Sequence, residues 1–285
     1  MKKWQVDFYH FPVVPRQWEL VICDRLGECA ETGREAKLIY IANCVSSQAN
    51  SQWLEQQFIA AAKGKLPDLI QVFRPQALGL LTVAAEKLGV SIEATRHTPD
   101  LKNIVYQRAL EQASNNNIPS YNPMAFDRPP PQPLPENLWG QEWQIANIAA
   151  GEIVDLFRER PLPVKDLPEA FYPLNLGIAS NVPIPGIVVY GGRNSLVLAR
   201  WLEQQKPVFL KYIPTEVGYS GGLILETGLI DRWIFNTFEG NNTAKIAEDY
   251  EQKKQQSQGL HFLLIQPDNS GMTYTGFWLL KEVEH

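Results

Sequence analysis

The stretch PDLIQVFRPQALGLLTVAAEKLGVSIEATR, residues 67–96, contains the pattern of a strand, a helix and a second strand in succession. Between Pro67 and Pro75 lies a short apolar run, and such a run is typical of a buried strand. Leucines and alanines recur at helical spacing through residues 76–89, and residues 90–96 again have the pattern of a strand. A right-handed crossover makes such strands parallel. The stretch therefore predicts a sheet with at least one parallel strand pair.

The elements on either side of this stretch complete a recognisable order. Three alternating or apolar runs precede it and are joined by short turns, which predicts an antiparallel meander. These three strands are expected at residues 4–11, 16–24 and 35–44, with helices at 50–64 and 98–113. Three antiparallel strands followed by helix, strand, helix, strand and helix is the element order of the ribonuclease H-like fold. We therefore predict a ribonuclease H-like mixed sheet with flanking helices for residues 1–114.

The clearest break in the chain is the segment at residues 115–140, which is rich in asparagine and proline. Each proline removes a backbone donor and fixes φ, so we expect a linker here. Residues 141–285 predict a second, α+β domain. It ends with two apolar runs, residues 259–266 and 275–280, that we expect to pair as strands covered on both faces. The predicted fold class is α/β (α+β), with two domains.

Composition limits the classes of partner and location. Acidic residues outnumber basic ones, 31 against 26, so the chain has no global positive field to attract nucleic acid. The cysteines Cys23, Cys29 and Cys44 fit neither a disulfide framework nor a zinc motif. We expect no cofactor and no bound metal. No apolar run approaches the length of a membrane span, and no signal or transit segment is recognised at the N-terminus, so we expect a cytoplasmic protein without membrane insertion.

The predicted fold raises the hypothesis of a nuclease. Two-metal cleavage needs several carboxylates around metals about 4 Å apart. Asp7 on the first strand and Glu55 on the first helix are the candidate ligands, but Arg74 lies at the tip of the next strand. A guanidinium there competes with metal ions for the same carboxylates. We therefore expect no enzymatic activity, and keep an active or degenerate nuclease as the alternative.

An ordered set of motifs resembles a known family. The motifs are VDFYHFPV with QWELVICD, IQVFRPQ, LPENLWGQEW, IPGIVVYGGR, and GLHFLLIQ with GFWLL, and they extend over both halves of the chain. Together they resemble the Tab-type RNA-binding family, which comprises chloroplast activators of photosystem I reaction-centre mRNA translation and their relatives in photosynthetic bacteria. The resemblance implies non-catalytic binding of A/U-rich single-stranded RNA in the 5′ leader of a photosystem mRNA, with the translation machinery as a further partner. A protein-binding photosystem assembly factor that does not touch RNA is a third hypothesis.

Single-stranded RNA is held by aromatic platforms together with a local basic groove. Phe73 with Arg74 and Arg96 with His97 follow two strands that would be neighbours in the predicted sheet. Open sheets place their binding sites at such strand ends. We therefore predict these four residues as RNA-binding, with Arg74 as a surface cation.

Two further candidates lie in the second half of the chain. The turn YGGRNS precedes a predicted helix, so Arg193 is expected to add charge and Ser195 to cap a helix N-terminus that receives phosphate. A plain strand-to-helix connection explains the same glycines equally well. Trp278 belongs to the Trp-Leu-Leu that matches the end of the family's sequence. We favour a core position for Trp278 and keep base stacking as the alternative.

Overall fold

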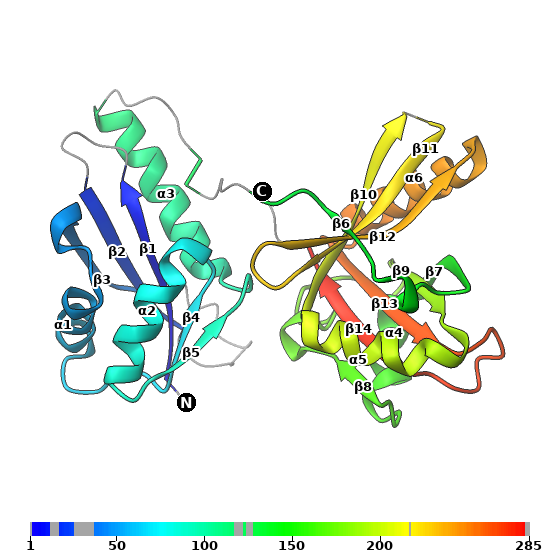
Figure 1. The fold of residues 1–285 in the computed structure, drawn as a ribbon, viewed down its shortest axis with the longest axis horizontal. Helices are drawn as coiled ribbons and strands as arrows, with labels where there is room; N and C mark the ends of the chain where they lie inside the picture. The colour runs from blue at the N-terminus through cyan, green and yellow to red at the C-terminus, as the bar shows by residue number, and fades with distance from the viewer. Residues whose placement is uncertain are drawn as a thin grey trace. The chain divides into compact units, whose positions relative to one another are not determined.

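The computed structural model describes residues 2–11, 17–25, 37–116, 122–123, 128–216 and 218–282. It divides into two compact units, Met1–Asp127 and Arg128–His285 (Figure 1). The described strands form three sheets accompanied by helices, so the predicted α+β class is confirmed. Among the described residues, no helix has both the length and the apolar character needed to cross a membrane.

The first unit is built on one five-stranded sheet of order β3-β2-β1-β4-β5. The first three strands are antiparallel, and β4 and β5 run parallel to β1. This order follows from a meander whose first strand then accepts two right-handed crossovers on its free side. The strands are β1 (Lys3–Phe11), β2 (Gln17–Arg25), β3 (Lys37–Val45), β4 (Leu69–Val72) and β5 (Ser91–Ala94).

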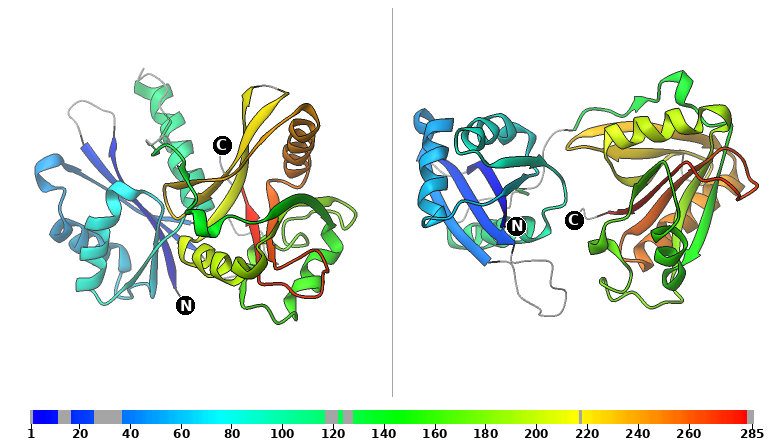
Figure 2. Two further views of the ribbon diagram at one scale, coloured as in Figure 1. Left: turned by 45° about the vertical axis from the view of Figure 1, so that its right-hand side comes forward. Right: turned by 90° about the horizontal axis from the view of Figure 1, so that it is seen from below.

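Helices cover both faces of this sheet, and the alternation of side chains along β1 determines which residues meet them. Trp4, Val6 and Phe8 point into the core beneath α1 and α2, whereas Tyr9 points into the smaller core beneath α3. The ribbon in Figure 2 shows helices on both faces of this sheet. Asn50 begins α1 by accepting a hydrogen bond from the backbone N–H of Trp53 at 2.9 Å. The helices are α1 (Ser51–Ala62), α2 (Pro75–Lys87) and α3 (Pro99–Asn116), with a short 3-10 helix η1 (Ser46–Gln48) before α1.

The second unit contains two sheets. The first has the order β10-β11-β12-β6, and the second has the order β7-β9-β13-β14-β8. Their strands are β6 (Gln132–Pro133), β7 (Glu142–Ala149), β8 (Val164–Asp166), β9 (Pro183–Tyr190), β10 (Pro207–Glu216), β11 (Ser220–Thr227), β12 (Asp231–Glu239), β13 (Leu260–Gln266) and β14 (Gly276–Lys281). The helices are α4 (Ala150–Arg158), α5 (Ser195–Gln205) and α6 (Asn241–Gln256), with 3-10 turns η2 (Glu136–Leu138), η3 (Glu169–Phe171) and η4 (Gly192–Asn194).

The two apolar runs near the end of the chain form β13 and β14, which are antiparallel neighbours inside the five-stranded sheet. Both of its faces are covered. Trp278 and Leu280 point into the core shared with the other sheet, and Phe277 and Leu279 point into the core on the side of α4. Trp278 is only 1% exposed. The two runs thus form a strand pair that is covered on both faces.

Part of the segment that we expected to be a linker has regular structure. β6 pairs with Trp233 and Ile234 of β12, and η2 follows it directly. β6 lies at the edge of its sheet, which is where a proline-containing strand is tolerated. Residues 128–140 thus pack within the second unit. The division into two domains with a linker between them stays a prediction.

Candidate functional site

The carboxyl ends of β4 and β5 lie side by side, as the sequence predicts. Val72 pairs with Ala94, and the backbone N–H of Thr95 donates to the carbonyl of Val72 at 2.9 Å. Phe73 with Arg74 and Arg96 with His97 therefore follow adjacent strand ends. The sheet brings together two of the predicted pairs of site residues.

Arg74 is not the surface cation that we expected. Its Nε and Nη2 donate to Oδ1 and Oδ2 of Asp7 at 2.7 and 2.8 Å, and Nη2 also donates to the carbonyl of Pro123 at 2.8 Å. The side chain of Arg74 is 10% exposed and that of Asp7 is 0% exposed. A planar guanidinium matches a carboxylate in this two-bond geometry, which is why the pair tolerates burial. Arg74 is thus committed to the interior of the first unit.

The other residues at this edge are also largely covered. Phe73 is 1% exposed, Arg96 is buried and His97 is half-buried. The Nζ of Lys102 donates to the carbonyl of Arg96 at 2.9 Å and lies 5.5 Å from the centroid of the Phe73 ring. In this arrangement the Phe73 ring has no face open to a base. RNA binding by these four residues stays a prediction.

The two carboxylates of the nuclease hypothesis lie on opposite faces of the sheet. Asp7 alternates with Val6 and Phe8, which face α1 and α2, so it points toward α3. Glu55 belongs to α1 and lies 3.7 Å from the Nζ of Lys87. Within the described ranges, no group of three or more His, Cys, Asp and Glu side chains is arranged to hold a metal ion. The geometry therefore does not bring Asp7 and Glu55 together as metal ligands.

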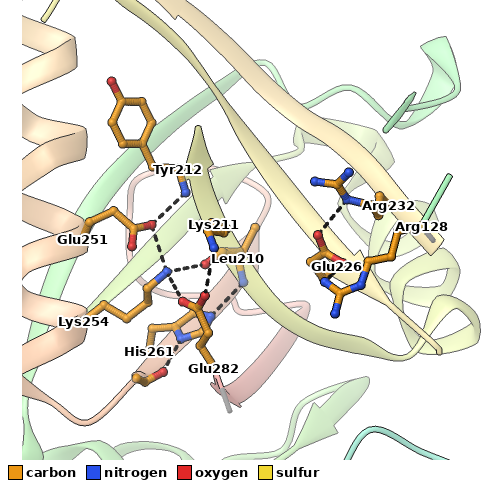
Figure 3. A network of polar contacts seen from close by, with 11 residues as sticks. Arg128, Leu210, Lys211, Tyr212, Glu226, Arg232, Glu251, Lys254, His261 and Glu282 are labelled. Atoms are coloured by element: carbon orange, nitrogen blue, oxygen red, sulfur yellow. Dashed lines mark hydrogen bonds and ion pairs between the residues drawn. The ribbon is translucent and has the colours of Figure 1, made fainter. Parts of the chain in front are cut away.

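A polar network in the second unit resembles an acid–base site but is fully committed to structure (Figure 3). The Nζ of buried Lys254 contacts Glu251 at 2.9 Å, Glu282 at 2.7 Å and the carbonyl of Leu210 at 2.8 Å. The carboxylate of Glu251 also accepts from the backbone N–H of Tyr212 at 2.7 Å. These contacts join α6 to β10 and to the residue that follows β14. The network therefore holds these elements together rather than forming a reaction centre.

His261 lies beneath this network and is held as a neutral ring. Its Nε2 accepts from the backbone N–H of Leu210 at 2.9 Å, so its Nδ1 carries the proton and donates to the carbonyl of Gly259 at 2.8 Å. Burial lowers the pKa of His261 well below its usual value, and the positive charge of Lys254 lowers it further. Both ring nitrogens are used by the backbone, which leaves no lone pair for a ligand.

The predicted phosphate turn lies between β9 and α5. The N–H groups of Gly191 and Gly192 donate to the carbonyls of Gln266 and Pro267, both at 2.9 Å. Gly192 has a φ of +52°, and a Cβ there would lie 2.5 Å from the side chain of Gln141. The left-handed backbone conformation therefore favours glycine at this position, and a larger residue would also require the Gln141 side chain to shift.

The structure separates the two candidate residues of this turn. Asn194 occupies the N-cap position of α5 and Ser195 is its first helical residue, so the expected capping role of Ser195 is wrong. Ser195 is buried. Arg193 is exposed, and within the described residues its side chain makes no hydrogen bond or ion pair. Arg193 is thus the exposed member of this pair, and its role in RNA binding stays a prediction.

An apolar pocket with aromatic walls lies beside this turn. The turn contacts two residues that are sequence neighbours of the pocket lining: the side-chain amide of Asn194 donates to the carbonyl of Asn137 at 3.3 Å, and Gly192 approaches Gln141. These residues flank Trp139, which is 58% exposed at the pocket. The lining residues are Leu134, Leu138, Trp139, Gly140, Glu142, Trp143, Ile187, Val189, Leu198, Leu223, Phe235 and Asn236.

The sequence contains a signal for this pocket that we did not use. Trp139 and Trp143 flank Gly140 in the motif LPENLWGQEW, directly after a run of prolines. Two tryptophans so close together indicate an aromatic cluster, but only the tertiary structure shows that both line one pocket and that Trp139 is 58% exposed.

Comparison with known proteins gives matches over both units. The model of the RNA-binding protein Tab2/Atab2 N-terminal domain matches residues 3–108, and that of the C-terminal domain matches residues 121–281. A protein TAB2 homolog, chloroplastic, from Arabidopsis thaliana is 28% identical over 99% of this chain and 75% of its own length. The protein of the same name from Zea mays is 26% identical over 99% of this chain and 72% of its own length.

These relatives correct one expectation. We expected a cytoplasmic protein, but both relatives are named as chloroplastic, which points to a plastid instead. Cysteine content distinguishes only reducing from oxidising compartments. It does not separate the cytoplasm from the interior of a plastid, so the expectation of a cytoplasmic location was wrong.

Proposed function

The chain belongs to the Tab2/Atab2 family of RNA-binding proteins, and from this premise we propose that it binds A/U-rich single-stranded RNA without cleaving it. The observation that carries the proposal is a pocket walled by Trp139, Trp143 and Phe235. The turn that holds the exposed Arg193 is tied to the segment before Trp139 through Asn194. Aromatic faces and a nearby cation are the two elements that hold single strands, because bases stack and phosphates carry charge.

The charge of the chain supports a single strand over a duplex. The net charge is −5. Of the six arginines of the second unit, three are ion-paired and two more lie over aromatic rings. Duplex binding depends mainly on many phosphate contacts. A surface with few unpaired cations gains more binding free energy from base stacking than from phosphate contacts. Stacking on a protein requires bases that are not paired in a duplex, so the second unit suits a single strand.

The target and the cellular role are further parts of the proposal. We propose that the RNA is the 5′ leader of a photosystem mRNA and that binding supports its translation and photosystem biogenesis, in contact with the translation machinery. This rests on the family resemblance over both halves of the chain and on two relatives that are named as chloroplastic.

For the first unit we propose a ribonuclease H-like sheet that no longer supports metal chemistry. The strand order β3-β2-β1-β4-β5 supports the fold, and the ion pair between Arg74 and Asp7 supports the loss of catalysis. The guanidinium already neutralises the carboxylate that a metal ion would need. This unit then contributes stability and surface rather than a reaction.

The test is a single incubation with two readouts. An end-labelled A/U-rich RNA of 20 nucleotides is mixed with the full chain in magnesium or manganese, and both the bound fraction and the RNA length are followed. We expect bound and intact RNA. Cleavage that disappears in Asp7→Asn would establish a nuclease instead, and intact RNA that never binds would favour the assembly-factor hypothesis.

A further inference from the structure

Building on the proposed function, we propose that the pocket beside η4 receives one unpaired nucleobase of the bound RNA. The base stacks on Trp139, its edge meets Asn236 and Glu142, and its phosphate lies toward Arg193. The pocket is formed entirely by residues of the second unit. Its aromatic walls, polar groups and neighbouring charge each support this occupant.

The aromatic walls are held in place before any ligand arrives. Trp139 is 58% exposed, yet its indole N–H donates to the carbonyl of Leu134 at 3.0 Å. Trp143 is half-buried, with its ring centroid 6.1 Å from that of Phe238. A platform that is already ordered loses little conformational entropy on binding. Trp139 therefore provides an exposed aromatic surface at low cost.

A bulge in β12 places the third aromatic wall. Asn236 pairs with Leu223 and Ile234 pairs with Ile224, so Phe235 is an additional residue between two paired positions. Such bulges redirect a side chain that regular alternation would place elsewhere. Phe235 packs against the core shared by the two sheets and also lines the pocket.

The polar residues in the lining suit the edge of a base. The Oδ1 of Asn236 accepts from the backbone N–H of Thr237 at 2.8 Å, which leaves its amide N–H groups as donors. The carboxylate of Glu142 is an exposed acceptor. Unpaired bases present donors and acceptors together on one edge. The lining thus offers one partner of each kind.

The charge beside the pocket is available for a phosphate. Other arginines of the second unit contact a carboxylate or an aromatic ring; they are Arg128, Arg158, Arg160, Arg200 and Arg232. Within the described residues, Arg193 makes no such contact. An unpaired arginine next to an aromatic pocket is complementary to a nucleotide, whose flat base and anionic phosphate are adjacent.

The same features disfavour an apolar side chain of a protein partner as the occupant. An apolar group fits the walls but makes no hydrogen bond to the amide N–H groups of Asn236 or to the carboxylate of Glu142. It would also make no use of the charge on Arg193. A nucleotide provides a base edge for Asn236 and Glu142 and a phosphate for Arg193, so it is the occupant that the geometry favours.

The test measures RNA affinity by fluorescence anisotropy with an A/U-rich 12-nucleotide single strand. We expect Trp139→Ala to weaken binding by roughly 5- to 100-fold, which corresponds to losing one stacked base. Trp139→Phe keeps an aromatic face and should recover most of the affinity, whereas Trp139→Leu keeps only apolar bulk and should not. Tyr219→Ala removes an exposed aromatic elsewhere and serves as the matched control.

A second probe is the same strand with every base removed and the ribose–phosphate backbone kept. We expect the parent chain and Trp139→Ala to bind it equally weakly, because it has phosphates but no bases. If the parent binds the RNA and Trp139→Leu binds as tightly as Trp139→Phe, the inference is overturned while the proposed function stands. A parent chain that binds no RNA overturns both.

Discussion

Arg74 supplies the charge that allows the carboxylate of Asp7 to lie in the interior of the first unit. The two side chains are joined by hydrogen bonds of 2.7 and 2.8 Å, although they are 67 residues apart in the sequence. Removing one partner of such a pair leaves an uncompensated buried charge, which costs more than the pair itself contributes.

We therefore expect Arg74→Ala to lower the free energy of unfolding by about 3–5 kcal/mol. Arg193→Ala is the matched control, because an exposed arginine without such partners should change stability by no more than about 0.5 kcal/mol. Urea unfolding of both variants measures the difference. An Arg74→Ala protein as stable as the parent would show that the ion pair does not support the fold.

His261 gives the protein a specific dependence on pH. Its folded pKa lies well below the usual 6.5 because burial and the charge of Lys254 disfavour the imidazolium. The unfolded chain takes up the proton near pH 6.5, so protonation below this pH stabilises only the unfolded state. This contribution to stability is complete above pH 6.5 and is lost as the pH falls below it, until the folded pKa is reached.

The expected size is about 1.4 kcal/mol for each pH unit below 6.5. Between pH 7.5 and 5.5 the parent chain should therefore lose about 1.4 kcal/mol more than His261→Gln, which has no group that titrates at this position. The measurement is urea unfolding of both proteins at the two pH values. Equal losses would mean that the pKa of His261 is the same in the folded and the unfolded chain.

At the scale of elements, β13 and β14 form the centre of the second unit. Trp278 pairs with Leu263 across the two strands, and a Cβ on Gly276 would lie 2.7 Å from its ring. Glu282 follows β14 directly, and its ion pair with Lys254 links this end of β14 to α6. The Nζ of Lys254 also donates to a carbonyl of β10 (Figure 3). Packing and this ion-pair network together hold a segment near the chain end that would otherwise fray.

Trp278→Ala should lower the free energy of unfolding by about 3–5 kcal/mol, because it removes a buried aromatic and leaves a cavity. Trp139→Ala, at an exposed position, should cost about 1 kcal/mol or less. RNA binding by Trp278→Ala should fail only where the protein has unfolded, which melting and binding in the same buffer will show. A variant that melts like the parent yet loses RNA would make Trp278 a stacking platform.

The order of helices and strands could be predicted from the sequence because periods of 2 and 3.6 residues are local properties. The meander, the crossovers around residues 67–96 and the terminal strand pair all follow from such patterns. β6 and β8 are two and three residues long, too short to show a period. The burial of Arg74 and the pocket at Trp139 depend on residues distant in sequence, so local patterns did not reveal them.

At the scale of the whole molecule, an acidic chain is proposed to bind an acidic polymer. This requires that stacking, rather than net charge, provides most of the affinity. Arg193 is the one arginine beside the aromatic pocket without a partner among the described residues, so few phosphates can be neutralised there. The dependence of binding on salt therefore reports directly on how the RNA is held.

The measurement that tests this most directly is an anisotropy titration of the full chain with an A/U-rich single strand and with its duplex, at several salt concentrations. We predict tighter binding of the single strand. The slope of log affinity against log salt should stay near −2, since each phosphate contact on a single strand contributes about −0.7 and about three contacts are expected. Tighter binding of the duplex, or a slope of about −5 or steeper, would contradict the account.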